Sequence, residues 1–440
     1  MRGAATPGRT ILTAFAIAIT LGTAILMLPV MANEPTSLVH ALFTATSAIC
    51  VTGLAVVDTA THWTFTGQMT IMAFAQLGGL GIMTMSTLVV LLFGSRMGLN
   101  TLLAVKTENN VISTRDLRSL VKRIALFSFG VELLITAVLV ARYTRVYGYE
   151  LGDALFHSAF HAVMSFNAAG FALYSDGLTQ FAGDTVVLTM MSFGVIMGGL
   201  GFPVVFELRR NWRRPREWSL LTKVTVWVTV PLFIIPTFMF TLIEGNNPDT
   251  FGPFRGGQLV ALAFFTAVMP RSGGLNAFDI GSMMPESLLL TNVLMFIGGG
   301  SASTAGGIRV TTFGVLIYML WAELRGRPDV EIGHRRISLT NQRQAISVVF
   351  LSIALIIVST GAILATTHIH LEPVLFEVIS AFGTVGLSMG ITSQLPPVAH
   401  VILSFLMFAG RLGPLTLGTA LALRMQKPLR TLPEERITIG

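Results

Sequence analysis

The sequence predicts an all-α polytopic membrane protein built from four pseudo-repeats, each with a helix, a short re-entrant helix and its loop, and a second helix. The chain is 52% apolar and 12% charged, which is about half the charge of an ordinary soluble domain. Long apolar runs alternate with shorter ones, and a glycine signal returns after 117, 104 and 112 residues. Internal repetition at such a period indicates one structural unit used several times.

Eight apolar runs are long enough for a membrane-spanning helix, which needs roughly 20 residues. The first resembles a secretory signal, but it is longer than the usual apolar core of about 7–15 residues. The repeat also requires it as a first helix, so we expect it to be retained. The expected spans are 11–31, 69–93, 122–141, 182–206, 220–243, 286–321, 344–366 and 396–423.

A shorter, half-apolar stretch lies between the two members of each pair, at 38–50, 153–167, 258–270 and 373–383. Stretches of this length cannot cross a bilayer, so we expect re-entrant helices. Each ends in a glycine followed by a bulky apolar residue, within SAICVTGLAVVD, SFNAAGFALYSD, MPRSGGLNAFD and SAFGTVGLSMG. The aligned glycines are Gly53, Gly170, Gly274 and Gly386.

The predicted organisation follows from these runs and from the basic residues. Of 29 Lys and Arg, 23 lie in the N-terminus, in 95–123, 207–223 and 322–343, and in the C-terminal tail. Clustered basic residues mark the cytoplasmic side, so both termini are expected inside and the net charge of +7 reflects topology rather than nucleic-acid binding. The units are repeat 1 at 1–95, a cytoplasmic linker at 96–121, repeat 2 at 122–207, a basic cytoplasmic linker at 208–219, repeat 3 at 220–321, a cytoplasmic linker at 322–342, repeat 4 at 343–425 and a cytoplasmic tail at 426–440.

The four glycine-ended loops predict a central ion pore. Non-helical backbone at membrane depth is tolerated where it is buried in protein or lines a water-filled path. Extended backbone can turn carbonyl oxygens toward an axis and replace the hydration shell of a cation, and glycine allows the φ angles required. The expected filter residues are Val51, Thr52, Gly53, Ala168, Ala169, Gly170, Ser272, Gly273, Gly274, Thr384, Val385 and Gly386. None is ionised, which favours a monovalent cation, because Ca²⁺ and Mg²⁺ sites recruit carboxylates.

Three of the four loops carry an acid a few residues further on, at Asp58, Asp176 and Asp279. Acids at an outer mouth raise the local concentration of cations. The alternative is that these aspartates cap loop turns or the helix that follows.

These features together resemble the Trk/Ktr/HKT superfamily of potassium transporters. The resemblance rests on CVTGL, NAAGF, RSGGLN and TVGLS, in register between paired helices over nearly the whole chain. With a first helix near residue 11, the chain is more similar to the KtrB type of membrane subunit than to the longer TrkH type. Glycine in all four loops implies potassium selectivity, since some sodium-favouring members carry serine at the first position. The third loop departs from the family pattern, and Gly273 is expected to loosen that quadrant.

The stretch GGGSASTAGG interrupts the sixth apolar run. Its five glycines each lower helix propensity by roughly 1 kcal/mol relative to alanine, and its hydroxyl groups can satisfy freed backbone groups. The resemblance implies an intramembrane gating loop at 298–310, below the filter, that obstructs the pore and moves aside during conduction. The alternative is a close-packing surface between helices. The expected gate residues are Gly298, Gly299, Gly300, Ser301, Ala302, Ser303, Thr304, Ala305, Gly306, Gly307 and Arg411.

Arg411 interrupts the last apolar run. A cation at membrane depth is costly and normally faces the protein interior with a partner. We expect it to project into the pore below the filter, as a barrier to cations and an anchor for the loop. The alternative is a structural arginine between helices.

No enzyme is predicted, because catalytic triads, phosphate loops and paired catalytic acids do not emerge. The single cysteine, Cys50, excludes an intramolecular disulfide, and His157 and His161 lack a third ligand nearby in sequence, so no transition metal is expected. The resemblance implies K⁺ as the transported ion at the filter, with Na⁺ as a further transported or coupling ion, and no covalent cofactor.

The resemblance also implies partners and a location. It implies a homodimer in the lipid bilayer of the bacterial plasma membrane, docked on a cytoplasmic ring of KtrA-like nucleotide-binding regulatory subunits. ATP or ADP would bind to that ring and not to this chain. The alternative function is a secondary, sodium-coupled solute transporter, which also has broken helices, but such transporters are expected to use inverted repeats.

Overall fold

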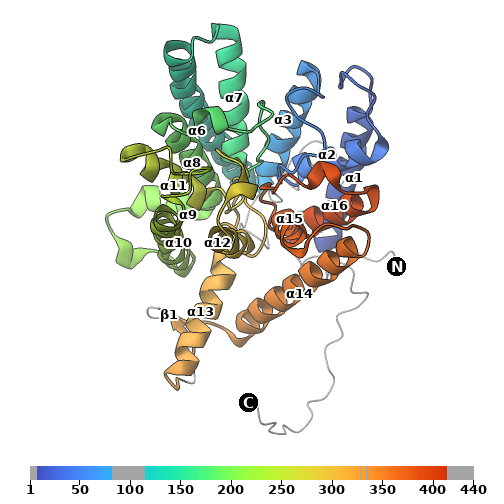
Figure 1. The fold of residues 1–440 in the computed structure, drawn as a ribbon. Helices are drawn as coiled ribbons and strands as arrows, with labels where there is room; N and C mark the ends of the chain where they lie inside the picture. Colours follow the sequence, from blue (N-terminus) through green and yellow to red (C-terminus); the bar gives the residue numbers. More distant parts are fainter. Residues whose placement is uncertain (1–6, 82–113, 328, 333–334, 414–440) are drawn as a thin grey trace.

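Four groups of helices surround a common centre in the computed structural model, which describes residues 7–81, 114–327, 329–332 and 335–413 (Figure 1). The described α-helices are α1 Pro7–Leu26, α2 Leu38–Ile49, α3 Phe65–Gly79, α6 Thr114–Val146, α7 Leu151–Asn167, α8 Thr185–Gly199, α9 Phe202–Asn211, α10 Leu220–Glu244, α11 Gly257–Val268, α12 Pro285–Phe296, α13 Val310–Leu324, α14 Leu339–Leu364, α15 Leu371–Gly383 and α16 Pro397–Leu412. Short 3₁₀ helices are η1 Thr179–Phe181, η2 Pro215–Glu217, η3 Ile280–Ser282 and η4 Thr392–Gln394.

The four short helices α2, α7, α11 and α15 lie where re-entrant helices were predicted, with each end within three residues of the prediction. The second helix of each repeat packs against the short helix of the next: α3 on α7, α8 on α11, α12 on α15, and α16 back on α2. Because the last contact returns to the first repeat, the packing forms a closed ring (Figure 1). The predicted all-α polytopic fold is confirmed.

Polar side chains define where several of these helices begin. Ser37, Thr64, Asp184, Ser219 and Ser338 each precede a helix and accept a hydrogen bond from a backbone N–H of its first turn. Such caps satisfy donors that have no partner inside the helix. The sequence therefore sets the starts of α2, α3, α8, α10 and α14 locally, before any packing.

Within the described residues, three helices are long and apolar enough to span a membrane: the 121–146 part of α6, α10 and α14. The run predicted as a span at 182–206 is not one straight helix: α8 and α9 together are long and apolar enough to span a membrane but meet at an angle of 99°. Gly201 has a φ of +92° at this break, a conformation open to glycine but not to a continuing helix. The predicted span at 286–321 is interrupted between α12 and α13, as expected from its glycines.

The expected spans 69–93 and 396–423 are only partly within the described residues. α3 and α16 cover the starts of the expected spans 69–93 and 396–423. Residues 82–113 and 414–440, and with them most of the 96–121 linker and the whole 426–440 tail, lie outside the described residues. The repeat boundaries themselves stay predictions.

A small β-hairpin in the linker after α13 was not predicted. It pairs β1 Glu331–Ile332 with β2 Arg335–Arg336, and an ion pair of 2.8 Å joins Arg336 to Asp329. Ile332 and its buried apolar neighbours in this linker pack beside α10 and α13. The hairpin therefore fixes this linker to the helices of repeat 3.

Candidate functional site

The four aligned glycines meet at the centre of the helix ring and form what we call the glycine ring: Gly53, Gly170, Gly274 and Gly386. A Cβ atom added to Gly53 would lie 2.4 Å from the carbonyl oxygen of Ala169, in the next repeat. One added to Gly386 would lie 2.2 Å from the carbonyl oxygen of Thr52, which closes the ring. Because these neighbours are backbone atoms that cannot rotate away, no larger residue fits without moving the loops.

The same backbone conformation occurs in all four loops. The residue two positions before each glycine has a left-handed φ although it is not a glycine: Val51 at 57°, Ala168 at 61°, Ser272 at 67° and Thr384 at 47°. Each ring glycine also has a positive φ, between 66° and 97°. Left-handed residues with a side chain are strained and persist where the surroundings enforce them. Four such pairs at equal positions indicate one loop structure repeated around the ring.

Hydrogen bonds from the short helices hold the loops. In repeats 1, 2 and 4, the residue before the glycine donates its N–H to the carbonyl five residues earlier, at 2.7–2.9 Å. In repeat 3, Gly273 instead bonds to the carbonyl of Met269, four residues earlier, at 2.7 Å. A Cβ on Gly273 would lie 2.6 Å from the sulfur of Met269. The extra glycine therefore permits a tighter turn at this point, while the expectation that it loosens the quadrant stays a prediction.

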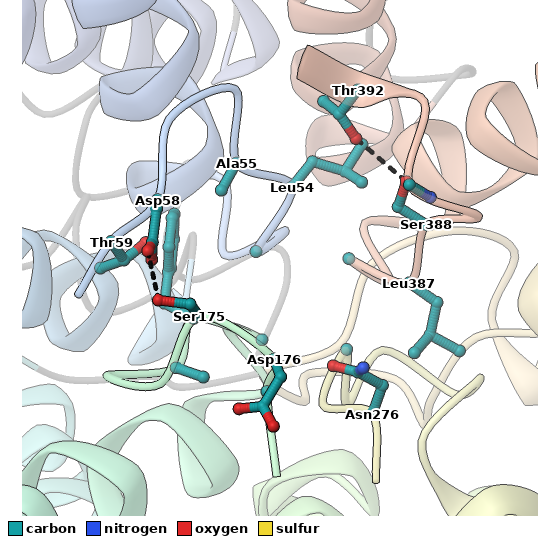
Figure 2. A pocket seen from close by; sticks show the side chains of 18 of the residues that line it. Leu54, Ala55, Asp58, Thr59, Ser175, Asp176, Asn276, Leu387, Ser388 and Thr392 are labelled. Carbon is teal, nitrogen blue, oxygen red and sulfur yellow. Dashed lines mark hydrogen bonds between the residues drawn. The ribbon is translucent and has the colours of Figure 1, made fainter. Parts of the chain in front are cut away.

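A cavity of about 550 Å³ lies on one side of the glycine ring, and we call it the vestibule. All four ring glycines line it, and the rest of its lining comes from residues that follow those glycines in each repeat. Figure 2 shows side chains from different repeats around it, with Asp58, Asp176 and Thr392 on separate loops. The vestibule is thus the space into which all four loops open.

The three predicted mouth acids all line the vestibule. Asp58 accepts hydrogen bonds from the N–H of Ala60 and the hydroxyl of Ser175, and Asp279 accepts them from the first turn of η3. These two therefore cap loop turns, as the alternative interpretation holds, while also facing the cavity. Asp176 is exposed, and its carboxylate accepts no hydrogen bond from the described residues.

The fourth quadrant contains a buried acid, Glu377, that sequence reasoning missed. It is linked to the vestibule through Thr392, which stands six residues after Gly386, as Asp176 stands six residues after Gly170. Its hydroxyl donates to the carboxylate of Glu377, a residue of α15 that is 0% exposed. An acid in the middle of a short apolar helix, beyond its first turn, was the available signal.

The segment 298–307, here called the 298–307 loop, lies on the other side of the ring. Where it meets the filter loops, it contacts residues that precede the ring glycines, such as the carbonyl of Phe166, which accepts from Thr304, and Gly383, which packs on Gly307. The vestibule is lined by residues at and after the glycines, so the loop covers the opposite end. A parallel bridge between Ile297 and Ile308 closes its base.

Two arginines, the predicted Arg411 and Arg309, bind the carbonyls of this loop. Arg411 is 2% exposed and donates to the carbonyl of Thr304 in the loop and to that of Gly78 in α3. Arg309 donates to the carbonyls of Gly300 and Ala305, the latter at 2.6 Å. Arg411 therefore ties the loop to the first repeat, and its role as a barrier to cations stays a prediction.

The loop also pairs with the α8–α9 break through backbone hydrogen bonds. Gly300 donates to the carbonyl of Gly199 at 2.8 Å, and Phe202 donates to the carbonyl of Ala302 at 3.2 Å. Ala302 has a left-handed φ of 56°. Repeats 2 and 3 are thus joined at their two breaks.

A short pattern, glycine–any–leucine–glycine, marks the second helices and was missed in the sequence. It occurs at 78–81, 198–201 and 410–413. A Cβ on its first glycine would lie 1.8–2.1 Å from the carbonyl four residues before a ring glycine, for example 1.8 Å between Gly410 and Phe382. Its second glycine has a φ of 83–92°. Gly298 stands 24 residues after Gly274, as Gly410 stands 24 after Gly386, so the repeat-3 break begins at the equivalent position.

The pore-helix histidines His157 and His161 pack among aromatic side chains. His161 is buried, its Nδ1 lies 2.7 Å from the carbonyl oxygen of His157, and its ring stacks on Tyr174. Among the described residues, no group of three or more His, Cys, Asp or Glu could hold a metal ion.

Comparisons with known proteins agree with this architecture. Residues 3–429 match the model of the TrkH family, described as a cation transport protein. The chain is 39% identical to the Ktr system potassium uptake protein B of Bacillus subtilis, covering 99% of this chain and 97% of that protein. It is 37% identical to the protein of the same name in Vibrio alginolyticus, over 94% and 91%.

Two further similarities extend the comparison. The chain is 33% identical to the potassium/sodium uptake protein NtpJ of Enterococcus hirae, over 99% of this chain and 97% of that protein. The crystal structure of the potassium transporter TrkH from Vibrio parahaemolyticus has the same fold, with a TM-score of 0.70 at 16% identity, covering 94% of this chain and 84% of that one. These relatives are named as transporters and not as enzymes. The chain belongs to the TrkH family of cation transport proteins and is KtrB-like within it.

Proposed function

We propose that this protein takes up K⁺ across the bacterial plasma membrane, with the glycine ring as its selectivity filter. The observation that carries the proposal is the meeting of four loops of equal backbone conformation at the floor of the vestibule. The expected filter residues have neutral side chains, so a dehydrated cation would be held by carbonyl and hydroxyl oxygens. The names of the relatives support potassium as the ion.

The proposal includes a gate at the 298–307 loop. Support comes from its position on the side of the ring opposite the vestibule and from its composition, since a glycine-rich segment has little helical structure to lose when it moves. Arg411, which holds the loop through Thr304, would keep it in place until conduction. While the gate is closed, the guanidinium of Arg411 also places a positive charge on the path of a cation.

The proposal also includes partners and membrane orientation. Two relatives are named as components of a Ktr system, which supports a partner subunit. We propose that this partner is a cytoplasmic ring of nucleotide-binding subunits that carry the ATP or ADP, and that this chain docks on it as a homodimer. The basic segments 207–223 and 322–343 are the proposed docking surfaces, with both termini on the same cytoplasmic side. One relative is named a potassium/sodium uptake protein, which supports Na⁺ as a second transported or coupling ion.

Potassium uptake by the wild type and the Gly53→Ser variant tests the filter. Both are expressed, with a regulatory ring, in a bacterium that lacks its own potassium uptake. The wild type should rescue growth at low K⁺, and Gly53→Ser should lower the preference for K⁺ over Na⁺ by about tenfold, which corresponds to 1.4 kcal/mol. Gly152→Ser is the matched control, because a Cβ at Gly152 has no neighbour within 4 Å. If the wild type takes up no potassium even with the ring supplied, the proposal fails and a secondary solute transporter becomes the better hypothesis.

A further inference from the structure

The third loop contains a buried arginine that has no counterpart in the other three. Arg271 stands three residues before Gly274, where the other repeats have Cys50, Asn167 and Gly383. Its side chain is 4% exposed. The repeat with this arginine is also the repeat whose second helix is broken by the 298–307 loop. An arginine at this depth is costly and requires a specific partner.

The partner of Arg271 is the first residue of the loop. The Nη2 atom of Arg271 donates to the carbonyl oxygen of Gly298 at 2.9 Å. The guanidinium carbon lies 4.8 Å from the centre of the Phe233 ring in α10. Nε and Nη1 have no partner among the described residues, and no carboxylate there pairs with the guanidinium. The polar contact of the buried charge is therefore with the loop.

The next residue binds the other end of the loop. The N–H of Gly306 donates to Oγ of Ser272 at 3.3 Å, and that hydroxyl donates to the carbonyl of Gly383 at 3.2 Å. The two ends of the loop lie together, since a Cβ on Gly298 would be 2.0 Å from the carbonyl oxygen of Gly306. Two consecutive residues of the third loop, Arg271 and Ser272, thus hold both ends.

We propose that Arg271 is a positioning residue that latches the 298–307 loop onto the third filter loop, so that opening the gate relaxes the filter of the same repeat. Arg309 and Arg411 also bind loop carbonyls, but Arg309 is the residue just before α13 and Arg411 lies in α16. Of these three arginines, Arg271 alone lies in a filter loop. Its hydrogen bond to Gly298 must break when the start of the loop moves away. The inference rests on the proposed function, because it needs a filter and a gate.

Removing the hydrogen bond from Arg271 to Gly298 is expected to raise the K⁺ flux. Arg271→Met keeps most of the length and apolar stem of the side chain but removes every donor to Gly298. A loop that is held less firmly is open for a larger fraction of time, so basal K⁺ flux should rise by about tenfold, as expected for one lost charge-assisted hydrogen bond. The preference for K⁺ over Na⁺ should fall in the same variant. Arg271→Lys, which retains a charged donor, should give an intermediate flux.

The test uses the purified full-length protein in liposomes without a regulatory ring, with K⁺ and Na⁺ fluxes measured per folded protein. Arg255→Met is the control, because Arg255 is exposed and lies outside the filter loops. In a Cys50→Ala background, Ser303→Cys reports the loop directly, since Ser303 is 5% exposed. Thiol labelling at this position should accelerate when Arg271→Met is added.

Three outcomes overturn the inference. Flux that falls in both Arg271 variants with an unchanged ion preference would make the arginine merely structural. Unchanged labelling at Ser303→Cys would show that the loop is not held by Arg271. If Arg271→Met does not fold, Phe233→Leu, which removes the aromatic face beside the guanidinium, must still raise flux. Absence of flux in the wild type with a ring supplied contradicts the proposed function instead, which separates the two failures.

Discussion

Replacing Gly410 by alanine should loosen the contact between α16 and α15 and destabilise the protein. A Cβ at this position would lie 1.8 Å from the carbonyl oxygen of Phe382 and 2.8 Å from its carbonyl carbon. Real Cβ contacts are essentially never shorter than 3.0 Å. The two helices must therefore separate by at least about 1.2 Å at this level, next to Arg411 and next to the start of the fourth filter loop.

The size of the effect follows from two opposing contributions. Overpacking of a well-packed site costs about 1–3 kcal/mol, and the upper end applies because a backbone carbonyl cannot rotate away. Alanine gains about 1 kcal/mol over glycine as a helix former. The net loss in free energy of unfolding should be about 2 kcal/mol.

Gly361→Ala supplies the matched control. Gly361 lies in α14, and a Cβ there meets nothing within 4 Å. Only the helix-forming gain applies, so this variant should be stabilised by up to about 1 kcal/mol. Thermal unfolding in detergent should give a lower midpoint for Gly410→Ala and an unchanged or higher one for Gly361→Ala.

The test depends on whether the two variants shift the unfolding midpoint in opposite directions. If both variants shift the unfolding midpoint in the same direction, the close approach of α16 to the Phe382 carbonyl does not control stability. Potassium uptake adds a second measurement. A Gly410→Ala protein that folds less stably but conducts with unchanged ion preference would show that this contact supports the fold without shaping the filter.

Three further outcomes are expected. Asp176→Asn should raise the KM for K⁺ uptake by a factor of about two to five while leaving the maximal rate unchanged, because an exposed carboxylate acts on the local ion concentration; an unchanged KM in low-salt buffer would contradict this. Arg411→Met should raise basal K⁺ flux in liposomes, since it releases the carbonyls of Thr304 and Gly78; a flux that does not rise would argue against an anchoring role. Cys50 is fully buried, so a maleimide should label the native protein at least about tenfold more slowly than the detergent-denatured one, and equally fast labelling would place this residue at a surface.

The ring of four glycines was predictable because its physical requirement is local. A loop that must bring its backbone to an axis needs glycine, and the four segments repeat that requirement at nearly equal spacing. The capped starts of α2 and α3 are local as well, since Ser37 and Thr64 are single-residue signals. The all-α architecture followed from hydropathy, which the bilayer imposes directly.

The parts that could not be predicted depend on contacts between repeats. The bend between α8 and α9 was hidden in a continuous apolar run, because hydropathy does not distinguish a straight span from a broken one. Gly201 alone could have been a packing glycine; its pairing with the 298–307 loop is visible only in three dimensions. Glu377 was missed for the same reason, since its link to the vestibule passes through Thr392, a residue of the following loop.

The paired breaks of repeats 2 and 3 make α9 a lever arm. Its near end is joined to the 298–307 loop through the backbone of Phe202, and its far end carries Arg209 and Arg210. Ten residues of helix are about 15 Å long, so a tilt of about 10° at the near end moves the far end by about 2.6 Å. Glu207 accepts hydrogen bonds from Ser219, so such a tilt carries the start of α10 with it. A force applied to the basic end of α9 therefore reaches the 298–307 loop with a smaller displacement and a larger force. It does so without passing through the filter.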